Sequence, residues 1–174
     1  MSDPQLAAPT GAEFVYTRVF DAPRDQVWAA FSDAVQLARW WGPAGMAVRV
    51  AELDLRSGGV FHYVLTLPGG NAMWGKFRYL EIVAPERIES ISCFSDPAGG
   101  VTRHPLSATW PLEMRNVLTL VEDSGRTVLT QRSLPHEASV EEQLSFEAGF
   151  AAMTGGFGSM YDQLAAFLSK CVAQ

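Results

Sequence analysis

Cysteine, histidine and basic residues are scarce in this sequence, and each scarcity argues against a class of protein. The two cysteines, Cys93 and Cys171, stand far apart in no CxxC spacing, so we expect no disulfide framework and a reducing, cytoplasmic setting. The three histidines form no HxH or HExxH motif, so no metal site is expected. Lys and Arg number 13 against 19 Asp and Glu, and the resulting net charge of -6 argues against a nucleic-acid partner.

Long hydrophobic runs are also absent. No segment approaches the ~18 uninterrupted apolar residues that cross a membrane, so no membrane partner is expected. Residues 1–11 lack the basic start and apolar run of a signal peptide, so residues 1–12 are expected to form a flexible lead-in. The remaining residues, 13–174, suit a single globular domain, because 48% of the chain is apolar and 18% is charged.

Motifs for catalysis and for phosphate binding are missing too. No G-x-S-x-G motif presents a serine nucleophile, and Cys93 has no histidine near it in its predicted strand. The glycine-rich segment 155–158 lies inside a predicted helix and lacks the Lys-Ser/Thr pair of a P-loop. Glu52 and Asp54 share one strand face, but exposed carboxylate pairs are common in acidic proteins. We therefore predict no catalytic residue and no cofactor.

Alternating apolar residues and frequent turn signals predict a chain rich in strands. Residues 14–20 alternate in a pattern that covers both faces of a strand. Turns that contain glycine or proline then separate short apolar segments. The predicted strands are residues 46–55, 60–67, 72–83 and 86–95, followed by a loop at 96–111 and a hairpin of 113–122 with 126–134. Connections this short favour an antiparallel meander over parallel β-α-β units.

Two short helices are predicted after the first strand. Pro23 stands near the first position of one helix, where proline is well tolerated, and Gly42-Pro43 ends the other. Their apolar residues are Val27, Trp28, Phe31 and Val35 in the first helix, and Leu37, Trp40 and Trp41 in the second.

A long final helix is predicted to start at a capping box formed by Ser139 and Glu142. Its apolar residues recur every three or four positions, so the helix needs a broad apolar surface to lie on, and the sheet provides one. These residues are Phe146, Phe150, Met153, Phe157, Tyr161, Leu164, Leu168 and Cys171. Glycine inside a helix costs up to ~1 kcal/mol relative to alanine. For Gly149, Gly155, Gly156 and Gly158 we favour a kink or a close approach to a strand over a mobile helix that gates a cavity.

Short motifs spread along the chain match a known pattern. The most specific are residues 18–23 (RVFDAP), Val27-Trp28 and residues 40–43 (WWGP). Weaker matches are residues 54–59 (DLRSGG), the strand of Gly75 that ends in residues 84–88 (APERI), residues 103–105 (RHP) and residues 110–113 (WPLE). Together these motifs resemble the family of activators of the heat-shock-protein-90 ATPase, within the START and birch-pollen-allergen-like superfamily. The resemblance runs from about residue 14 to the C-terminus.

This resemblance implies an α+β helix-grip fold. In that fold a curved antiparallel sheet of about seven strands wraps around a long C-terminal helix, with two short helices after the first strand and a cavity between sheet and helix. Members bind hydrophobic small molecules, so a hydrophobic or lipid-like ligand is the expected partner. The eukaryotic co-chaperones use an additional N-terminal domain, for which this chain has no room, so a chaperone partner is not expected. Members of the superfamily also form homodimers, and the oligomeric state stays open.

The residues expected to line the cavity come from the strands and from the final helix. Aromatic and methionine side chains supply adaptable apolar walls, and a few polar groups orient the oxygen atoms of a ligand. The candidates are Phe61, His62, Tyr63, Trp74, Arg78, Phe94, Met114, Asn116, Phe146, Phe150, Met153 and Phe157, with Lys76 and Arg115 as further polar groups. A shift of one residue would turn the candidates of a strand to its other face.

Three functions are compatible with these features. The leading hypothesis is a small-molecule-binding domain that carries, senses or sequesters a hydrophobic ligand. The second is a cavity enzyme, such as a cyclase, dehydratase or hydrolase of polyketide-like substrates, with His62, Tyr63 and Arg78 as its reactive groups. The third is an interaction module for a chaperone or another protein.

Overall fold

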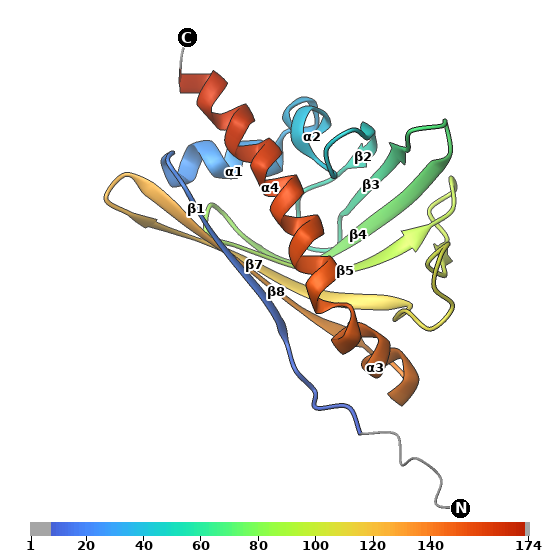
Figure 1. The fold of residues 1–174 in the computed structure, drawn as a ribbon. Helices are drawn as coiled ribbons and strands as arrows, with labels where there is room; N and C mark the ends of the chain where they lie inside the picture. Colours follow the sequence, from blue (N-terminus) through green and yellow to red (C-terminus); the bar gives the residue numbers. More distant parts are fainter. Residues whose placement is uncertain (1–7, 173–174) are drawn as a thin grey trace, which may run out of the picture.

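A computed structural model describes residues 8–172, so residues 1–7 of the expected lead-in lie outside the described residues. Figure 1 shows one curved sheet with the long C-terminal helix lying across it. Among the described residues, no helix is both long and apolar enough to cross a membrane. The elements are β1 (Phe14–Phe20), α1 (Arg24–Ser32), α2 (Ala34–Trp40), β2 (Ala47–Leu53), β3 (Val60–Thr66), β4 (Ala72–Val83), β5 (Arg87–Ser95), β6 (Val101–Thr102), β7 (Glu113–Asp123), β8 (Arg126–His136), α3 (Val140–Ala148) and α4 (Phe150–Val172).

The strands form one antiparallel sheet in the order β1-β8-β7-β5-β4-β3-β2, with β6 paired to β5. Strands β2 to β5 follow one another as the predicted meander. At the opposite end of the sheet β1 pairs with β8, and Phe14 lies opposite Ser133. The predicted loop 96–111 contains the additional strand β6. That strand has two residues, which is too short to produce the alternation from which strands are predicted.

The two predicted helices after β1 are confirmed. Asp33 separates them and caps α2, because its side chain accepts a hydrogen bond from the backbone N–H of Gln36 at 3.0 Å. Trp40 of α2 donates from Nε1 to the backbone oxygen of Ala30 in α1 at 2.9 Å, which links the two helices. Val35 belongs to α2 and is 67% exposed, so its predicted place in the apolar stripe of the first helix is wrong.

The predicted long helix is two helices, α3 and α4. The capping box is confirmed, since both of its hydrogen bonds between Ser139 and Glu142 are formed at the start of α3. The chain turns at Gly149, and α4 begins at the next residue. A Cβ atom on Gly149 would lie 2.7 Å from the ring of Trp110. The indole therefore occupies the space that a larger residue would need. The predicted kink occurs at this glycine, and the close approach is to a residue between β6 and β7 and not to a strand.

The core lies on the face of the sheet that α4 covers. We call this the inner face and the opposite side the outer face, and successive residues of a strand point to the two faces in turn. Tyr161, Leu164 and Leu168 of α4 pack with Leu120 and Leu129 of the sheet, and all five side chains are buried. Full burial of one such leucine contributes about 1.5–3 kcal/mol to stability. This is the helix-grip arrangement that the resemblance implies.

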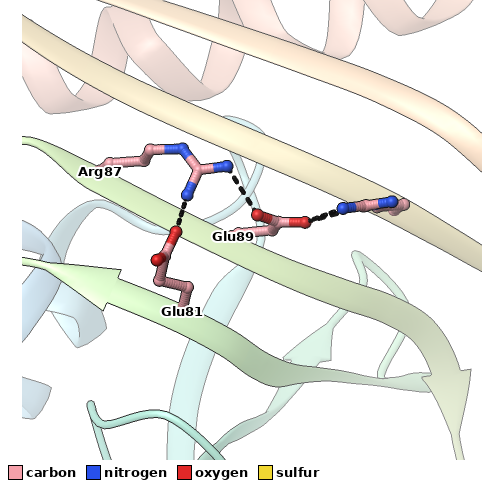
Figure 2. Close-up of polar contacts among 4 residues, drawn as sticks. Glu81, Arg87 and Glu89 are labelled. Carbon is pink, nitrogen blue, oxygen red and sulfur yellow. Dashed lines mark hydrogen bonds and ion pairs between the residues drawn. The ribbon is translucent and has the colours of Figure 1, made fainter.

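A ladder of charged side chains crosses the outer face from β4 to β7. Figure 2 shows Arg87 between Glu81 and Glu89, and it bonds to both carboxylates. Glu89, which is 7% exposed, also accepts a hydrogen bond from Nε of Arg115 at 2.8 Å. The bonds from Arg115 and then from Arg87 hold the pKa of the Glu89 carboxyl below its ordinary value. The ladder therefore joins three neighbouring strands through one nearly buried carboxylate.

Candidate ligand cavity

A cavity of about 110 Å³ lies between α4 and the inner face of the sheet. A second cavity of about 150 Å³ adjoins it, since Phe77 and Ser92 border both. We call these the first and the second cavity. The first is bordered by Phe31, Leu37, Trp41, Phe61, Phe77, Tyr79, Ile88, Ser90, Ser92, Asn116, Leu118, Gln131, Phe157, Met160 and Tyr161.

Aromatic rings from the sheet, from the end of α2 and from α4 form the walls of the first cavity. Phe61 of β3 and Phe77 of β4 stand opposite each other in register, so both point to the inner face. The ring of Trp41, which follows α2, meets both edge-on at 5.1 and 5.6 Å between ring centres. From α4, Phe157 and Tyr161 complete the walls with their rings stacked at 5.9 Å. Such edge-on and stacked contacts are the favoured arrangements of aromatic pairs.

Side-chain amides and hydroxyls border the same cavity on the sheet side. Nδ2 of Asn116 donates to Oγ of Ser92 at 2.8 Å and to the backbone oxygen of Met114 at 3.1 Å. Oδ1 of Asn116 accepts from Oγ of Ser133 at 2.7 Å and from Nε2 of Gln131 at 3.3 Å. The Asn116 amide is therefore fixed by four hydrogen bonds. We call the polar residues that border the cavity the polar floor: Ser90, Ser92, Asn116 and Gln131.

The first cavity is uncharged. Its border contains no Asp, Glu, Lys, Arg or His, and its ionisable groups are two tyrosines, Tyr79 and Tyr161. Burial raises the pKa of both phenols above the ordinary tyrosine value, so both are protonated at neutral pH. An unpaired charge is strongly disfavoured in such surroundings. The electrostatics of the cavity therefore suit a neutral molecule. Within residues 8–172, no three His, Cys, Asp or Glu side chains gather to hold a metal ion.

The second cavity depends on a glycine. A Cβ atom on Gly75 of β4 would lie 2.4 Å from the hydroxyl oxygen of Tyr63, so only glycine leaves room for that ring. Burial raises the pKa of Tyr63 to about 12, which keeps its phenol neutral as well. On its other side this cavity is bordered by Trp110, Pro111 and Leu112 of the β6–β7 connection.

The β6–β7 connection is held over the second cavity by tilted and edge-on aromatic contacts and by an ion pair. The ring of His104 lies between Phe94 and Trp110, at 4.5 and 6.1 Å between ring centres. Burial lowers the pKa of His104, so the imidazole is neutral at pH 7. Arg103 pairs with Glu142 at the start of α3, which ties the connection to the final helices.

Six of the residues predicted from the sequence border the two cavities. Five of them lie at inward-facing positions of the strands, and the sixth, Phe157, comes from α4. They are Phe61, Asn116 and Phe157 in the first cavity, and Tyr63, Phe94 and Met114 in the second.

Three other predicted residues lie on the outer face. Nε2 of His62 is 3.1 Å from Oγ of Ser95, and its ring stacks on Trp74 at 4.8 Å between ring centres. Arg78 stands opposite Ile91 in the outward register. These predicted cavity positions are therefore corrected. The reason is strand parity, because each residue neighbours an inward-facing one and a single strand cannot turn both inward. Lys76 and Arg115 share the outward parity.

The last three predicted residues belong to a different apolar cluster. Phe146, Phe150 and Met153 pack with Phe14 around the junction of α3 and α4, and none of them borders either cavity. Phe146 belongs to α3, which the break at Gly149 removes from the line of α4. Phe150 and Met153 lie in the first turn of α4, next to this junction. Their predicted place in the cavity is corrected accordingly.

Sequence reasoning missed the serines and the glutamine of the polar floor. Ser90 and Ser92 share their strand face with Ile88 and Phe94, and this spacing of two was visible in the sequence. Gln131 lies two residues from Leu129 in the same way. Polar residues within an inward-facing row were the available signal, and they were passed over in favour of larger aromatic and charged candidates.

Comparison with known proteins places the chain in a family. Residues 21–169 match the pattern of the family described as "Activator of Hsp90 ATPase homolog 1-like protein". The chain belongs to this family. The chain is also similar to solved structures. One is a protein of Arthrobacter aurescens, with 28% identity, a TM-score of 0.77 and coverage of 94% of this chain and 90% of that one.

Two more distant structures show the same fold. A Mycobacterium smegmatis protein has 24% identity and a TM-score of 0.74, with 94% of each chain covered. The AHSA1 protein of Silicibacter pomeroyi has 21% identity and a TM-score of 0.63, with 91% of this chain and 98% of that one covered. No curated protein matches this chain. The comparisons thus establish family and fold.

Proposed function

We propose that this chain binds a small, neutral, largely apolar molecule in the first cavity. The observation that carries the proposal is an uncharged, aromatic-walled, partly open cavity between α4 and the sheet, with a polar floor on one side. The absence of a disulfide between the free Cys93 and Cys171 is compatible with the reducing cytoplasm as the place where it acts.

The energetic cost of the cavity supports this proposal. Protein interiors are packed as densely as organic crystals, so a void in the core sacrifices contacts. At ~24 cal/mol per Å³, the value for a closed cavity, about 110 Å³ of empty space costs at most about 2.6 kcal/mol of stability. A bound molecule that fills the space restores those contacts. The fold therefore retains an unfavourable feature that ligand binding offsets.

The volume limits the size of the ligand. An engineered apolar cavity of about 150 Å³ binds benzene, so the first cavity, at about 110 Å³, limits a ligand held there alone to about one ring at most. A longer ligand extends past Phe77 and Ser92 into the second cavity, since these two residues border both.

Ser90→Leu tests the proposal. Oγ of Ser90 has no hydrogen-bond partner among residues 8–172, so the substitution fills the first cavity without breaking a bond. NMR titrations of the full chain use two neutral one-ring probes, 4-methylphenol and p-xylene. We expect at least one probe to shift the amide signals of residues around the first cavity, and Ser90→Leu to abolish that binding.

Thr130→Leu is the matched control. Thr130 pairs with Thr17 and Thr119 on the outer face, so the same added leucine leaves the cavity open and binding unchanged. Two results contradict the proposal: neither probe binds at millimolar concentration, or binding persists in Ser90→Leu.

A further inference from the structure

The hydrogen-bond capacity of the polar floor is only partly used within the protein. The amide of Asn116 donates twice and accepts twice, so it has nothing left to offer a ligand. Nε2 of Gln131 is also engaged, with Oγ of Ser133 at 3.0 Å among its acceptors. The oxygen atoms that can still form a hydrogen bond with a ligand therefore belong to the side chains around the amide of Asn116.

Three of those oxygen atoms keep free capacity. Among residues 8–172, Oγ of Ser90 and Oε1 of Gln131 have no hydrogen-bond partner, and both side chains border the first cavity. Ser90 is 3% and Gln131 6% exposed, so these two oxygen atoms face the cavity and not the outer surface of the protein. Oγ of Ser92 accepts from Asn116, which leaves its own hydrogen free to donate.

The three atoms lie around one amide. Ser90 stands opposite Asn116 in the β5–β7 register, while Ser92 and Gln131 contact that amide directly. The cavity thus presents hydroxyl donors from two serines next to a carbonyl acceptor from Gln131. Buried polar groups left without partners cost about 1–3 kcal/mol each, so a ligand that satisfies them binds more tightly than one that does not.

A hydroxyl group matches this arrangement. It accepts from a serine and donates to the Gln131 carbonyl, whereas a ketone or carboxylate oxygen only accepts and an ammonium group only donates. Charged groups are disfavoured further because no counter-ion borders the cavity. We propose that the polar floor recognises the hydroxyl group of a neutral, ring-sized phenol or alcohol, whose ring lies among the aromatic walls. This proposal rests on the proposed function.

The comparison of 4-methylphenol with p-xylene tests this recognition. The two probes have the same ring and nearly the same size, and a methyl group in p-xylene replaces the hydroxyl. A purely apolar cavity prefers p-xylene, because a hydroxyl loses its water on entry. We expect the full chain to bind 4-methylphenol at least tenfold more tightly, as measured by NMR titration.

Two variants locate the preference. Ser90→Ala removes a hydroxyl that has no internal partner, so the fold is preserved and the preference falls at least fivefold. Gln131→Leu removes the carbonyl acceptor and also lowers the preference for 4-methylphenol over p-xylene. Ser95→Ala is the matched control, because Ser95 lies on the same strand but faces outward, against His62, and leaves the preference unchanged.

The outcomes separate the two proposals. If p-xylene binds as tightly as 4-methylphenol, or if Ser90→Ala keeps the full preference, hydroxyl recognition is refuted. The proposed function then stands as long as Ser90→Leu still abolishes binding. If neither probe binds, both proposals fail.

Discussion

Replacing Asn116 by aspartate tests whether the polar floor is held by the network around this side chain. Asn116→Asp keeps the shape of the side chain but removes the N–H groups that donate to Ser92 and to the backbone oxygen of Met114. The Ser92 hydroxyl can reverse its bond and donate instead, whereas the Met114 carbonyl is left facing a carboxylate oxygen. The site is 7% exposed, so the introduced charge is not solvated.

The expected magnitude follows from the lost bond and the buried charge. Burial without a cationic partner raises the pKa of a carboxyl group, and each tenfold change in its acidity corresponds to about 1.36 kcal/mol. A roughly hundredfold loss of acidity, which allows for the donors that remain, corresponds to about 2.7 kcal/mol, and the lost bond to Met114 raises the total to about 4 kcal/mol at pH 7. The folded-state pKa is then above the unfolded value of about 3.9, so the folded protein binds the proton more readily. The loss of stability relative to the wild type is therefore largest at neutral pH, and it shrinks as the pH falls through the raised pKa.

Urea denaturation followed by tryptophan fluorescence measures this difference at pH 7 and pH 4.5. Asn71→Asp is the matched control, because Asn71 is exposed in the turn before β4 and the same change in charge has little effect there. The reasoning is refuted if Asn116→Asp is as stable as the wild type at pH 7. It is refuted equally if the deficit does not shrink in acid.

Two further predictions concern the outer face and the final helices. Glu89→Gln removes the negative charge and leaves one acceptor oxygen where two now bind the arginines, which costs about 1–3 kcal/mol at pH 7. Because the Glu89 pKa is lowered in the fold, this loss in the free energy of unfolding is full above the ordinary pKa of about 4.3 and disappears as the pH falls through the lowered value. The control is Glu52→Gln, because Glu52 has no ion pair within residues 8–172. In α4, Gly156→Ala stabilises by up to ~1 kcal/mol since its Cβ meets open space, whereas Gly149→Ala destabilises by about 1–3 kcal/mol because Trp110 must move. Urea titrations that show a deficit for Glu89→Gln at every pH, or the same sign for both glycine variants, contradict these expectations.

The fold was largely predictable because its signals are local. Alternation and glycine- or proline-containing turns give β1 and β4 with the bounds that the structure has, residues 14–20 and 72–83. The capping box at Ser139 marks the start of α3. A kink was among the expectations for the four glycines of the final helix, but the sequence did not show which of them would carry it. The apolar stripe continues across Gly149, and only the tertiary contact with Trp110 identifies the junction there. The same stripe includes Cys171, which the structure places in an exposed position.

The candidate site was predictable only in part, since it depends on which face of each strand turns inward. Phe61 and Tyr63 were expected in the cavity together with His62 between them, although a strand cannot turn all three to one face. The inward row of β5 could have been read from its alternation. Asn116 is fixed by hydrogen bonds, whereas Oγ of Ser90 has no partner among the described residues. Both facts depend on the pairing of β5 with β7 and of β7 with β8, which no local pattern specifies.

A high-resolution crystal structure of the chain soaked with 4-methylphenol addresses the binding site itself. We predict electron density for the compound in the first cavity, with its ring against Phe61 and Phe77 and its hydroxyl group among Ser90, Ser92 and Gln131. A structure in which the side chains of the protein close this space, so that no room is left for even a one-ring molecule, would contradict the proposed function.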